Sequence, residues 1–261
     1  MLLAISVAAA GPWVKSPGEA YVKASANVFR ATEYVAPGVE TSDLEYLGLT
    51  SSVYAEAGIA EGVQLVASVP WVSGRNLDTA TGWAHRTSGF GDLRAGIGLD
   101  VPKLELPASL SVIARVPLYD QSELEELSPQ IGDENVDLDA IAAVGGALPA
   151  GDHWIWLAAE TGLRWRTGLS PSGADLDLDP GLPYRVQVGL APRWGGWISV
   201  QGSGLVNLGS GADSKSWHQL GAGVAAPLVR GLHAEVGGAR TYAAELSSLG
   251  WSAEAGLSWK R

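Results

Sequence analysis

The sequence contains no cysteine, and this absence removes several kinds of chemistry at once. Thiol catalysis, thiolate metal sites, disulfides and lipid attachment through an N-terminal cysteine are all excluded. Charged residues are also scarce, at 17%, whereas a typical soluble protein has roughly 25%. The formal net charge of −11 argues against nucleic-acid binding, which needs a basic face. We predict no cofactor and no nucleic-acid partner.

Long apolar runs are missing as well. Residues 1–10 (MLLAISVAAA) are apolar and end in small residues before Gly11, as a signal peptide does at its cleavage site. This stretch is too short to cross a bilayer as a helix, which takes about 18 or more apolar residues, and no other stretch is long enough. We therefore expect a signal-peptide remnant at residues 1–10, no transmembrane helix, and one domain over residues 11–261.

Glycine and tryptophan are abundant, with 34 and 11 copies, and apolar residues recur at every second position. In SGFGDLRAGIGLDV (residues 88–101), for example, Leu93, Ala95, Ile97 and Leu99 alternate with polar residues and glycine. A period of two indicates β-strands with one apolar and one polar face. The pattern predicts twelve strands, at residues 19–35, 45–59, 63–73, 90–101, 107–118, 136–148, 153–166, 183–193, 197–208, 216–227, 232–243 and 250–260.

The connections between these strands alternate between long and short. Long ones are predicted at residues 36–44, 74–89, 119–135, 167–182, 209–215 and 244–249, and short turns separate the other strand pairs. Outer-membrane barrels have long extracellular loops at one rim and tight periplasmic turns at the other. The sequence therefore predicts an all-β fold: a transmembrane, antiparallel, up-and-down β-barrel of about twelve strands, with both termini at the periplasmic side.

The two faces of the predicted strands differ in charge. One parity is free of charge in five of the strands, as lipid contact demands, since a charge at the bilayer midplane costs about 2–4 kcal/mol. The opposite parity carries mixed charges, which we predict to line the lumen and the path of a solute. These residues are Lys23, Glu56, Asp92, Arg94, Arg115, Asp139, Glu160, Arg164, Arg185, Glu235 and Glu254. They either orient a solute or hold a narrow barrel together by ion pairs, and the sequence leaves both open.

Tryptophan lies mainly near the strand ends. Because tryptophan collects at both membrane–water interfaces, we predict two aromatic girdles that contain Trp71, Trp154, Trp165, Trp194, Trp197, Trp217, Trp251 and Trp259. The main alternative is a soluble, lipocalin-like barrel, in which the apolar residues would face inward. Whether residues 11–18 enter the lumen cannot be decided from the pattern.

Catalytic and metal-binding patterns are weak. Ser216, His218 and a loop aspartate could form the catalytic triad of a hydrolase. His218 can equally well be a non-catalytic histidine at the rim or in an aromatic girdle. The stretch DLDLDPG (residues 175–181) begins like a calcium loop, yet Pro180 stands where glycine is needed. The acidic stretch within residues 119–135 is expected to be a solvated loop. We predict no metal site and no enzymatic activity, with a barrel hydrolase as the least favoured alternative.

Three short motifs carry a resemblance to a known family. WVKSPGEAY (residues 13–21), GFGDLR (89–94) and GLSW (256–259) resemble outer-membrane transporter-like barrels, above all the phenol-degradation (meta-cleavage pathway) transporter family. Such barrels usually end on an aromatic residue that the assembly machinery reads, whereas here Lys260 and Arg261 follow Trp259.

The resemblance implies passage of small molecules, aromatic or hydrophobic ones among them. We therefore expect a bacterial outer-membrane channel that passes a small molecule through a charged lumen. Its expected partners are outer-membrane lipid and lipopolysaccharide, the barrel-assembly machinery and a small-molecule solute. A structural barrel with a blocked lumen is the runner-up.

Overall fold

Strands make up all the regular structure in the described part of the chain. The computed structural model describes residues 11–35, 44–78, 81–121, 128–171, 173, 177–211 and 214–261, so the expected signal-peptide remnant lies outside them. The strands are β1 (Ala20–Val35), β2 (Leu44–Ala60), β3 (Val63–Asp78), β4 (Ala84–Phe90), β5 (Asp92–Asp100), β6 (Ala108–Pro117), β7 (Asp137–Ala150), β8 (His153–Arg166), β9 (Gly181–Ala191), β10 (Trp197–Asn207), β11 (Ser216–Val229), β12 (Leu232–Glu245) and β13 (Ser247–Lys260).

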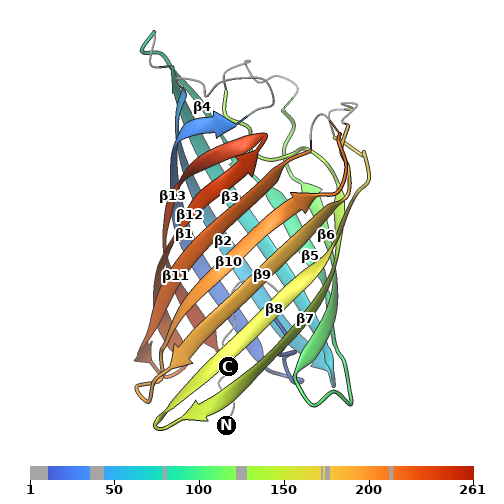
Figure 1. The fold of residues 1–261 in the computed structure, drawn as a ribbon, viewed down its shortest axis with the longest axis vertical. Helices are drawn as coiled ribbons and strands as arrows, with labels where there is room; N and C mark the ends of the chain where they lie inside the picture. Colours follow the sequence, from blue (N-terminus) through green and yellow to red (C-terminus); the bar gives the residue numbers. More distant parts are fainter. Residues whose placement is uncertain are drawn as a thin grey trace.

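These strands form one closed, antiparallel, up-and-down barrel (Figure 1). Each strand pairs with the next along the chain, except that β4 does not pair with β5, and β1 pairs with β13 to close the barrel, with Ala26 opposite Ala255. β4 and β5 both pair with β3 and are separated only by Gly91. They are two parts of one bent strand, so the barrel has twelve strands around its circumference, as the alternation predicted.

Gly91 marks a β-bulge inside the stretch GFGDLR. The register against β3 shifts by one residue there, since Trp71 faces Phe90 while Ser68 faces Arg94. Phe90 and, after the bulge, Ala95 consequently both point outward, although strict alternation would put them on opposite faces. The Gly91 N–H donates to the Pro70 carbonyl oxygen at 2.9 Å, which keeps the extra residue attached to β3.

Short turns gather at one end of the barrel, together with both termini (Figure 1). We call this the turn end and the opposite rim the loop end. Turn-end connections contain Gly62, Gly151, Gly195 and Gly231, each with a positive φ that other residues adopt only with strain. These glycines allow the chain to reverse within a few residues, as a barrel rim requires.

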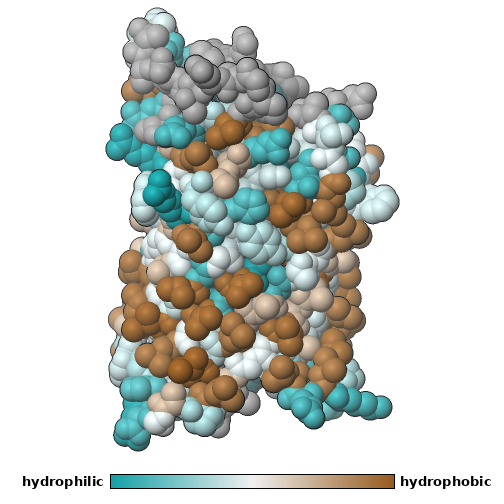
Figure 2. Space-filling view, viewed as in Figure 1, coloured by the Kyte–Doolittle hydropathy of each residue, from teal (hydrophilic) through white to brown (hydrophobic). Residues whose placement is uncertain are grey.

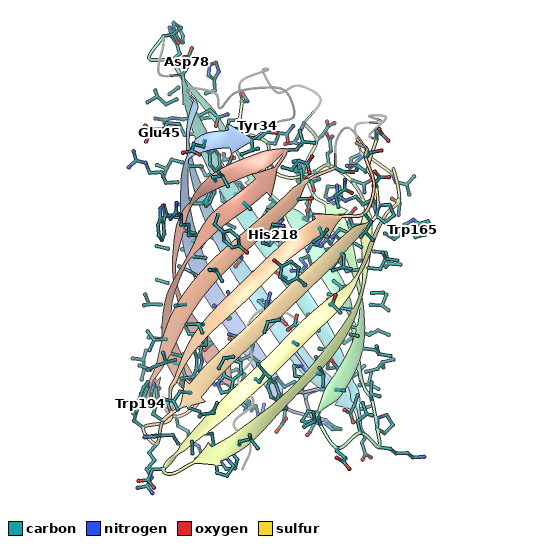
Figure 3. All side chains as sticks on the ribbon, viewed as in Figure 1. Tyr34, Glu45, Asp78, Trp165, Trp194 and His218 are labelled. Atoms are coloured by element: carbon teal, nitrogen blue, oxygen red, sulfur yellow. The ribbon has the colours of Figure 1, made fainter. Side chains whose placement is uncertain are left out.

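Two of the predicted loop-end connections are much shorter than expected. The loop predicted at 74–89 is mostly strand, because β3 runs on to Asp78 and β4 begins at Ala84, and Figure 3 shows Asp78 at the tip of this projecting hairpin. The loop predicted at 244–249 is a tight reversal at Leu246, which has a φ of 51°. Polar residues flank both reversals, among them Asp78 and Thr81 in the first and Glu245 and Ser247 in the second, so their composition resembled that of loops.

The outer face is apolar and the inner face is polar. Leucine, valine and isoleucine side chains are exposed on the outer surface of nearly every strand, and Figure 2 shows brown patches mainly over the lower half of the visible side, with white and teal between them. The buried side chains include many charged and polar ones, which point into the barrel. This is the reverse of a lipocalin-like barrel, whose apolar side chains fill the interior. No helix that could cross a membrane occurs among the residues that the structure describes.

Candidate functional site: the barrel lumen

The structure places all eleven charged residues predicted for the solute path on the inner face of the barrel. Most of them meet in two groups, which we call the arginine cluster and the lysine cluster. The arginine cluster consists of Arg94, Arg115, Asp137, Asp139, Glu160, Arg164 and Arg185. The lysine cluster consists of Lys23, Glu235 and Glu254. Of the two remaining residues, Glu56 pairs with Lys15 and Asp92 accepts a hydrogen bond from Tyr119.

Asp139 is the centre of the arginine cluster and is only 1% exposed. Its carboxylate accepts hydrogen bonds from Arg115 Nε at 2.9 Å and from Arg164 Nε at 2.8 Å, while Arg94 Nη2 lies 4.0 Å away. Neighbouring strands β5 to β8 present these side chains at adjacent levels. Three guanidinium groups thus share one carboxylate. These electrostatic interactions link the four strands β5 to β8 on the inside of the barrel.

The lysine cluster lies on the strands next to the closing seam. Lys23 Nζ lies 2.9 Å from Glu235 and 2.5 Å from Glu254, so β1, β12 and β13 are tied together from inside. The Tyr21 hydroxyl donates to Glu235 at 3.2 Å. One ammonium group and two carboxylates give this cluster a net charge of −1.

The segment at residues 11–18 enters the lumen near the turn end. Lys15, which is 2% exposed, lies 3.1 Å from the Glu56 carboxylate, and its backbone N–H donates to Gln64 Oε1 at 2.9 Å. Trp13 packs edge-on against Trp156, with ring centroids 6.3 Å apart. A Cβ at Gly58 would lie 2.0 Å from the Ser16 carbonyl oxygen, so only glycine lets the segment approach this closely. The segment therefore narrows the lumen at this end.

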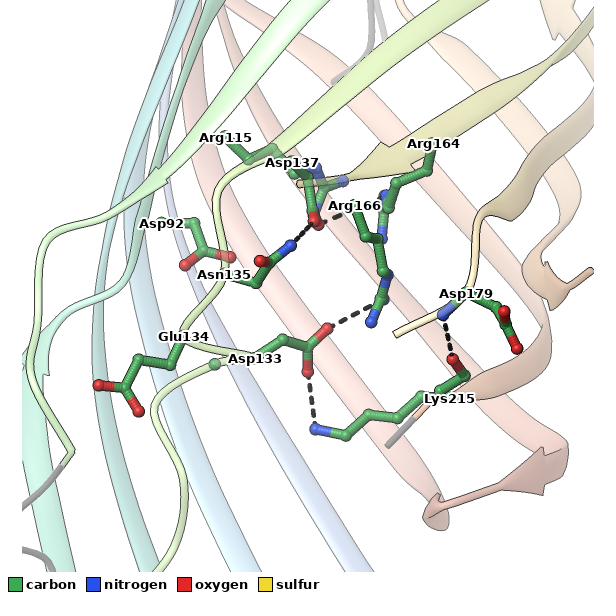
Figure 4. A network of polar contacts seen from close by, with 12 residues as sticks. Asp92, Arg115, Asp133, Glu134, Asn135, Asp137, Arg164, Arg166, Asp179 and Lys215 are labelled. Atoms are coloured by element: carbon green, nitrogen blue, oxygen red, sulfur yellow. Dashed lines mark hydrogen bonds and ion pairs between the residues drawn. The ribbon is translucent and has the colours of Figure 1, made fainter. Parts of the chain in front are cut away.

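A second segment, residues 128–135, reaches the wall at the loop end, where Pro129 lies beside Gly74 of β3, and Figure 4 shows its Asp133 next to Arg166 and Lys215. Asp133 lies 3.2 Å from Arg166 of β8 and 2.7 Å from Lys215, while Asn135 donates to Asp137. Glu134 is 9% exposed and Asn135 3%. The expectation of a solvated acidic loop is therefore wrong for Asp133 and Glu134, because Asp133 pairs with two cations far away in the sequence and Glu134 accepts the Gln121 N–H.

Asp133 makes the position of this segment insensitive to mild acid. Burial raises the pKa of Asp133, but Lys215 and Arg166 outweigh that effect and lower the pKa from its usual 3.8 to about 2. A carboxyl group with a lowered pKa stabilises the folded position at every pH above its unfolded value and loses that contribution as the pH falls through about 2.

We expect the segment to stay docked from pH 7 down to about pH 4 and to be released near pH 2. A spin label on Ser128→Cys, the sole cysteine in the chain, reports its mobility. The label should remain immobile at pH 4 and become mobile near pH 2. In an Asp133→Asn variant it should already be mobile at pH 7, and an immobile label in that variant would contradict the role of the ion pairs.

Six of the eight tryptophans predicted for the girdles are exposed on the outside of the barrel or at its rim: Trp71, Trp154, Trp165, Trp194, Trp251 and Trp259. Figure 3 shows Trp165 pointing outward toward the loop end and Trp194 at the turn end. That they sit at membrane interfaces stays a prediction. Trp197 and Trp217 were assigned wrongly, because they share the inward parity of their strands. Trp197 alternates with the buried Ser199, and Trp217 faces the buried Leu205.

The residues considered for catalysis do not come together. His218 Nδ1 lies 2.7 Å from the Tyr184 hydroxyl on the outer face, and the Tyr242 ring lies on its other side. The Ser216 hydroxyl instead accepts the Asn207 N–H. In the calcium-like stretch, Asp179 accepts the Gly211 N–H, while Asp175 lies outside the described residues. Among the described residues, no group of three or more acidic or histidine side chains is arranged to hold a metal.

A cavity of about 360 Å³ remains in the lumen. Its wall combines side chains from both charge clusters with the amides Asn27, Gln187, Gln201 and Gln219. Among the residues that sequence reasoning missed, Lys15, Trp13 and Asp133 lie outside the regular strand pattern. The alternation did place Gln187 and Gln201 on the inner face, but the predicted solute path was limited to charged residues and so left them out. The lumen is thus a polar space with a narrowed turn end and a covered loop end.

Solved structures resemble this fold at low sequence identity. An outer-membrane channel from Pseudomonas putida F1 has a TM-score of 0.73 and 13% identity, covering 98% of this chain and 100% of that one. The transport unit of the autotransporter AIDA-I from Escherichia coli has a TM-score of 0.55 and 10% identity, covering 93% and 90%. The translocator domain of NalP from Neisseria meningitidis has a TM-score of 0.53 and 15% identity, covering 94% and 89%.

No family model matches the sequence, and no curated protein is significantly similar to it. The structural similarities show the fold: a closed, antiparallel β-barrel of twelve strands of the kind found in outer-membrane proteins, among them channels and autotransporter units.

Proposed function

We propose that this protein is an outer-membrane channel that passes small molecules through its charged lumen. One observation carries the proposal: an apolar outer face encloses an inner face lined by charged and amide side chains around an unfilled cavity. Lipid on the outside and water on the inside match the two faces of a transmembrane barrel. The turn end is then periplasmic and the loop end extracellular.

The lumen lining favours polar solutes. Aromatic or hydrophobic solutes, which the family resemblance implied, would need apolar walls, and only a few apolar side chains, such as Phe29 and Trp197, line the cavity. Charged walls that face each other orient polar molecules by their dipoles. We therefore propose small polar molecules as the solutes.

A structural barrel with a blocked lumen is the second candidate. It is favoured by the two segments, residues 11–18 and 128–135, that fold into the two ends of the barrel. Residues 11–18 are held by the Lys15–Glu56 ion pair, hydrogen bonds and the packing of Trp13 on Trp156, and residues 128–135 by ion pairs and hydrogen bonds, so neither segment is a strand of the barrel wall.

Planar-bilayer recording separates these two candidates. The refolded protein should insert into bilayers and give discrete conductance steps in KCl, and liposomes that contain it should swell in small sugars or amino acids. Folding is checked by the heat-dependent shift in gel mobility that barrels show. A folded, inserted protein that gives neither conductance nor swelling would support the blocked barrel.

A further inference from the structure

Glycines in the barrel wall leave the space that forms the lumen cavity. β11 and β12 present Gly223 and Gly237 inward, so this part of the wall carries no side chains that could fill the lumen. On either side, β9 and β10 contribute Arg185 and Gln201, and β13 contributes Glu254. The cavity therefore lies between a wall that belongs to the arginine cluster and a wall that belongs to the lysine cluster.

Arg185 is incompletely paired on the first wall. Its nearest carboxylate is Glu160, at 3.9 Å from Nη1, which is beyond hydrogen-bonding distance. Its Nε and Nη1 atoms are buried and have no hydrogen-bond partner among the described residues. A buried guanidinium donor without a partner is costly, and a carboxylate beside the guanidinium offsets part of that cost by its charge and by accepting from an N–H group that faces the cavity.

Glu254 occupies the second wall. Its Oε1 atom accepts from Lys23, but the side chain is 36% exposed to the cavity, compared with 6% for Glu235 in the same cluster. The net charge of this cluster is negative, so the exposed carboxylate attracts a cation. Gln201 adds a buried amide oxygen, Oε1, which has no hydrogen-bond partner in the described part of the chain.

We propose that the cavity is a binding site for a small zwitterion, whose carboxylate lies against Arg185 and whose ammonium group lies against Glu254. The negatively charged wall would repel a simple anion, and the guanidinium group of Arg185 would repel a simple cation. Only a molecule with both charges is complementary to both walls. The assignment of this ligand as a transported solute rests on the proposed function, but its binding does not.

Three probes with the same five-carbon chain test the proposal: 5-aminovalerate, valerate and pentylamine. Their binding to the intact, detergent-solubilised barrel is measured by isothermal titration calorimetry. We expect 5-aminovalerate to bind about tenfold or more tightly than either singly charged probe, because each loses one charge-assisted contact. Equal affinity for valerate and 5-aminovalerate would overturn the proposal in favour of a plain anion site, and a lack of binding would overturn it entirely.

Two variants should separate the two walls. Arg185→Gln should weaken the binding of 5-aminovalerate and valerate and leave the binding of pentylamine unchanged. Glu254→Gln should weaken the binding of 5-aminovalerate and pentylamine and leave the binding of valerate unchanged. Arg193→Gln removes an arginine that is exposed at the turn end and should change none of the three. Arg185→Lys keeps the charge without the planar fork and should give an intermediate loss. Equal losses for all three probes in both wall variants would contradict the assignment.

The same proteins in planar bilayers keep the two proposals apart. Binding without conductance would overturn the channel and leave the zwitterion site intact. Conductance without preferential binding of 5-aminovalerate would overturn the zwitterion site and leave the channel intact.

Discussion

A protein that begins at Gly18 should conduct several times more current than the full chain. Residues 11–17 place Pro12, Trp13 and Lys15 inside the barrel near the turn end, where their side chains are largely buried against the wall. Removing them opens the narrowed end of the lumen without touching any strand, since β1 begins at Ala20. Single-channel recording of refolded protein in KCl measures the change.

A charge reversal provides a version of this experiment that retains the segment. Lys15→Glu places a second carboxylate beside the buried Glu56, so the segment should be expelled and the conductance should rise toward that of the truncated protein. Lys103→Glu makes the same charge change at an exposed turn-end position and should leave the conductance unchanged. If the truncated protein folds and conducts no more than the full chain, residues 11–17 do not limit the current.

Asp139→Ala should destabilise the barrel more than any other single change to a lumen charge. It removes the carboxylate shared by Arg94, Arg115 and Arg164 and leaves three guanidinium groups to repel one another. Breaking a buried ion pair by removing one partner costs about 3–5 kcal/mol. Urea unfolding of the barrel, followed by tryptophan fluorescence, should show a fall of this order in the free energy of unfolding.

Asp152→Ala is the matched control. Asp152 pairs with Arg193 at the turn end, where both side chains are more than half exposed, and exposed pairs contribute only about 0–1 kcal/mol. Adding Arg94→Gln to Asp139→Ala should recover part of the lost stability, because it removes one of the repelling charges. No recovery would indicate that the loss comes from the vacated space and not from the unbalanced charge.

The strand number and the two faces of the wall could be predicted from the sequence because both depend on a local period of two. The bulge at Gly91 was not predicted, since one extra residue in one strand leaves the alternation on either side intact. Trp197 shows a different kind of error. Its position at a strand end indicated a girdle, but its parity with Ser199 and Gln201 already placed it inside.

The contacts of the segments at residues 11–18 and 128–135 could not be predicted for another reason. Lys15 meets Glu56, and Asp133 meets Arg166 and Lys215, through contacts between residues far apart in the chain. No local period records such a contact. The inward charges of the strands could be found by parity, but which of them pair depends on the register between strands, and that comes only from the structure.

The segment at residues 11–18 also has a consequence for the order of folding. Its partners Glu56, Gln64, Ser109 and Trp156 lie on β2, β3, β6 and β8, and Ser109 accordingly contacts a residue 98 positions earlier in the chain. These partners come together only when the sheet has curved. Contacts of such long sequence separation carry the largest loop-closure entropy and form late. We therefore expect the wall to assemble first and its own N-terminal residues to enter it last, so that burial of Trp13 marks the final step of maturation.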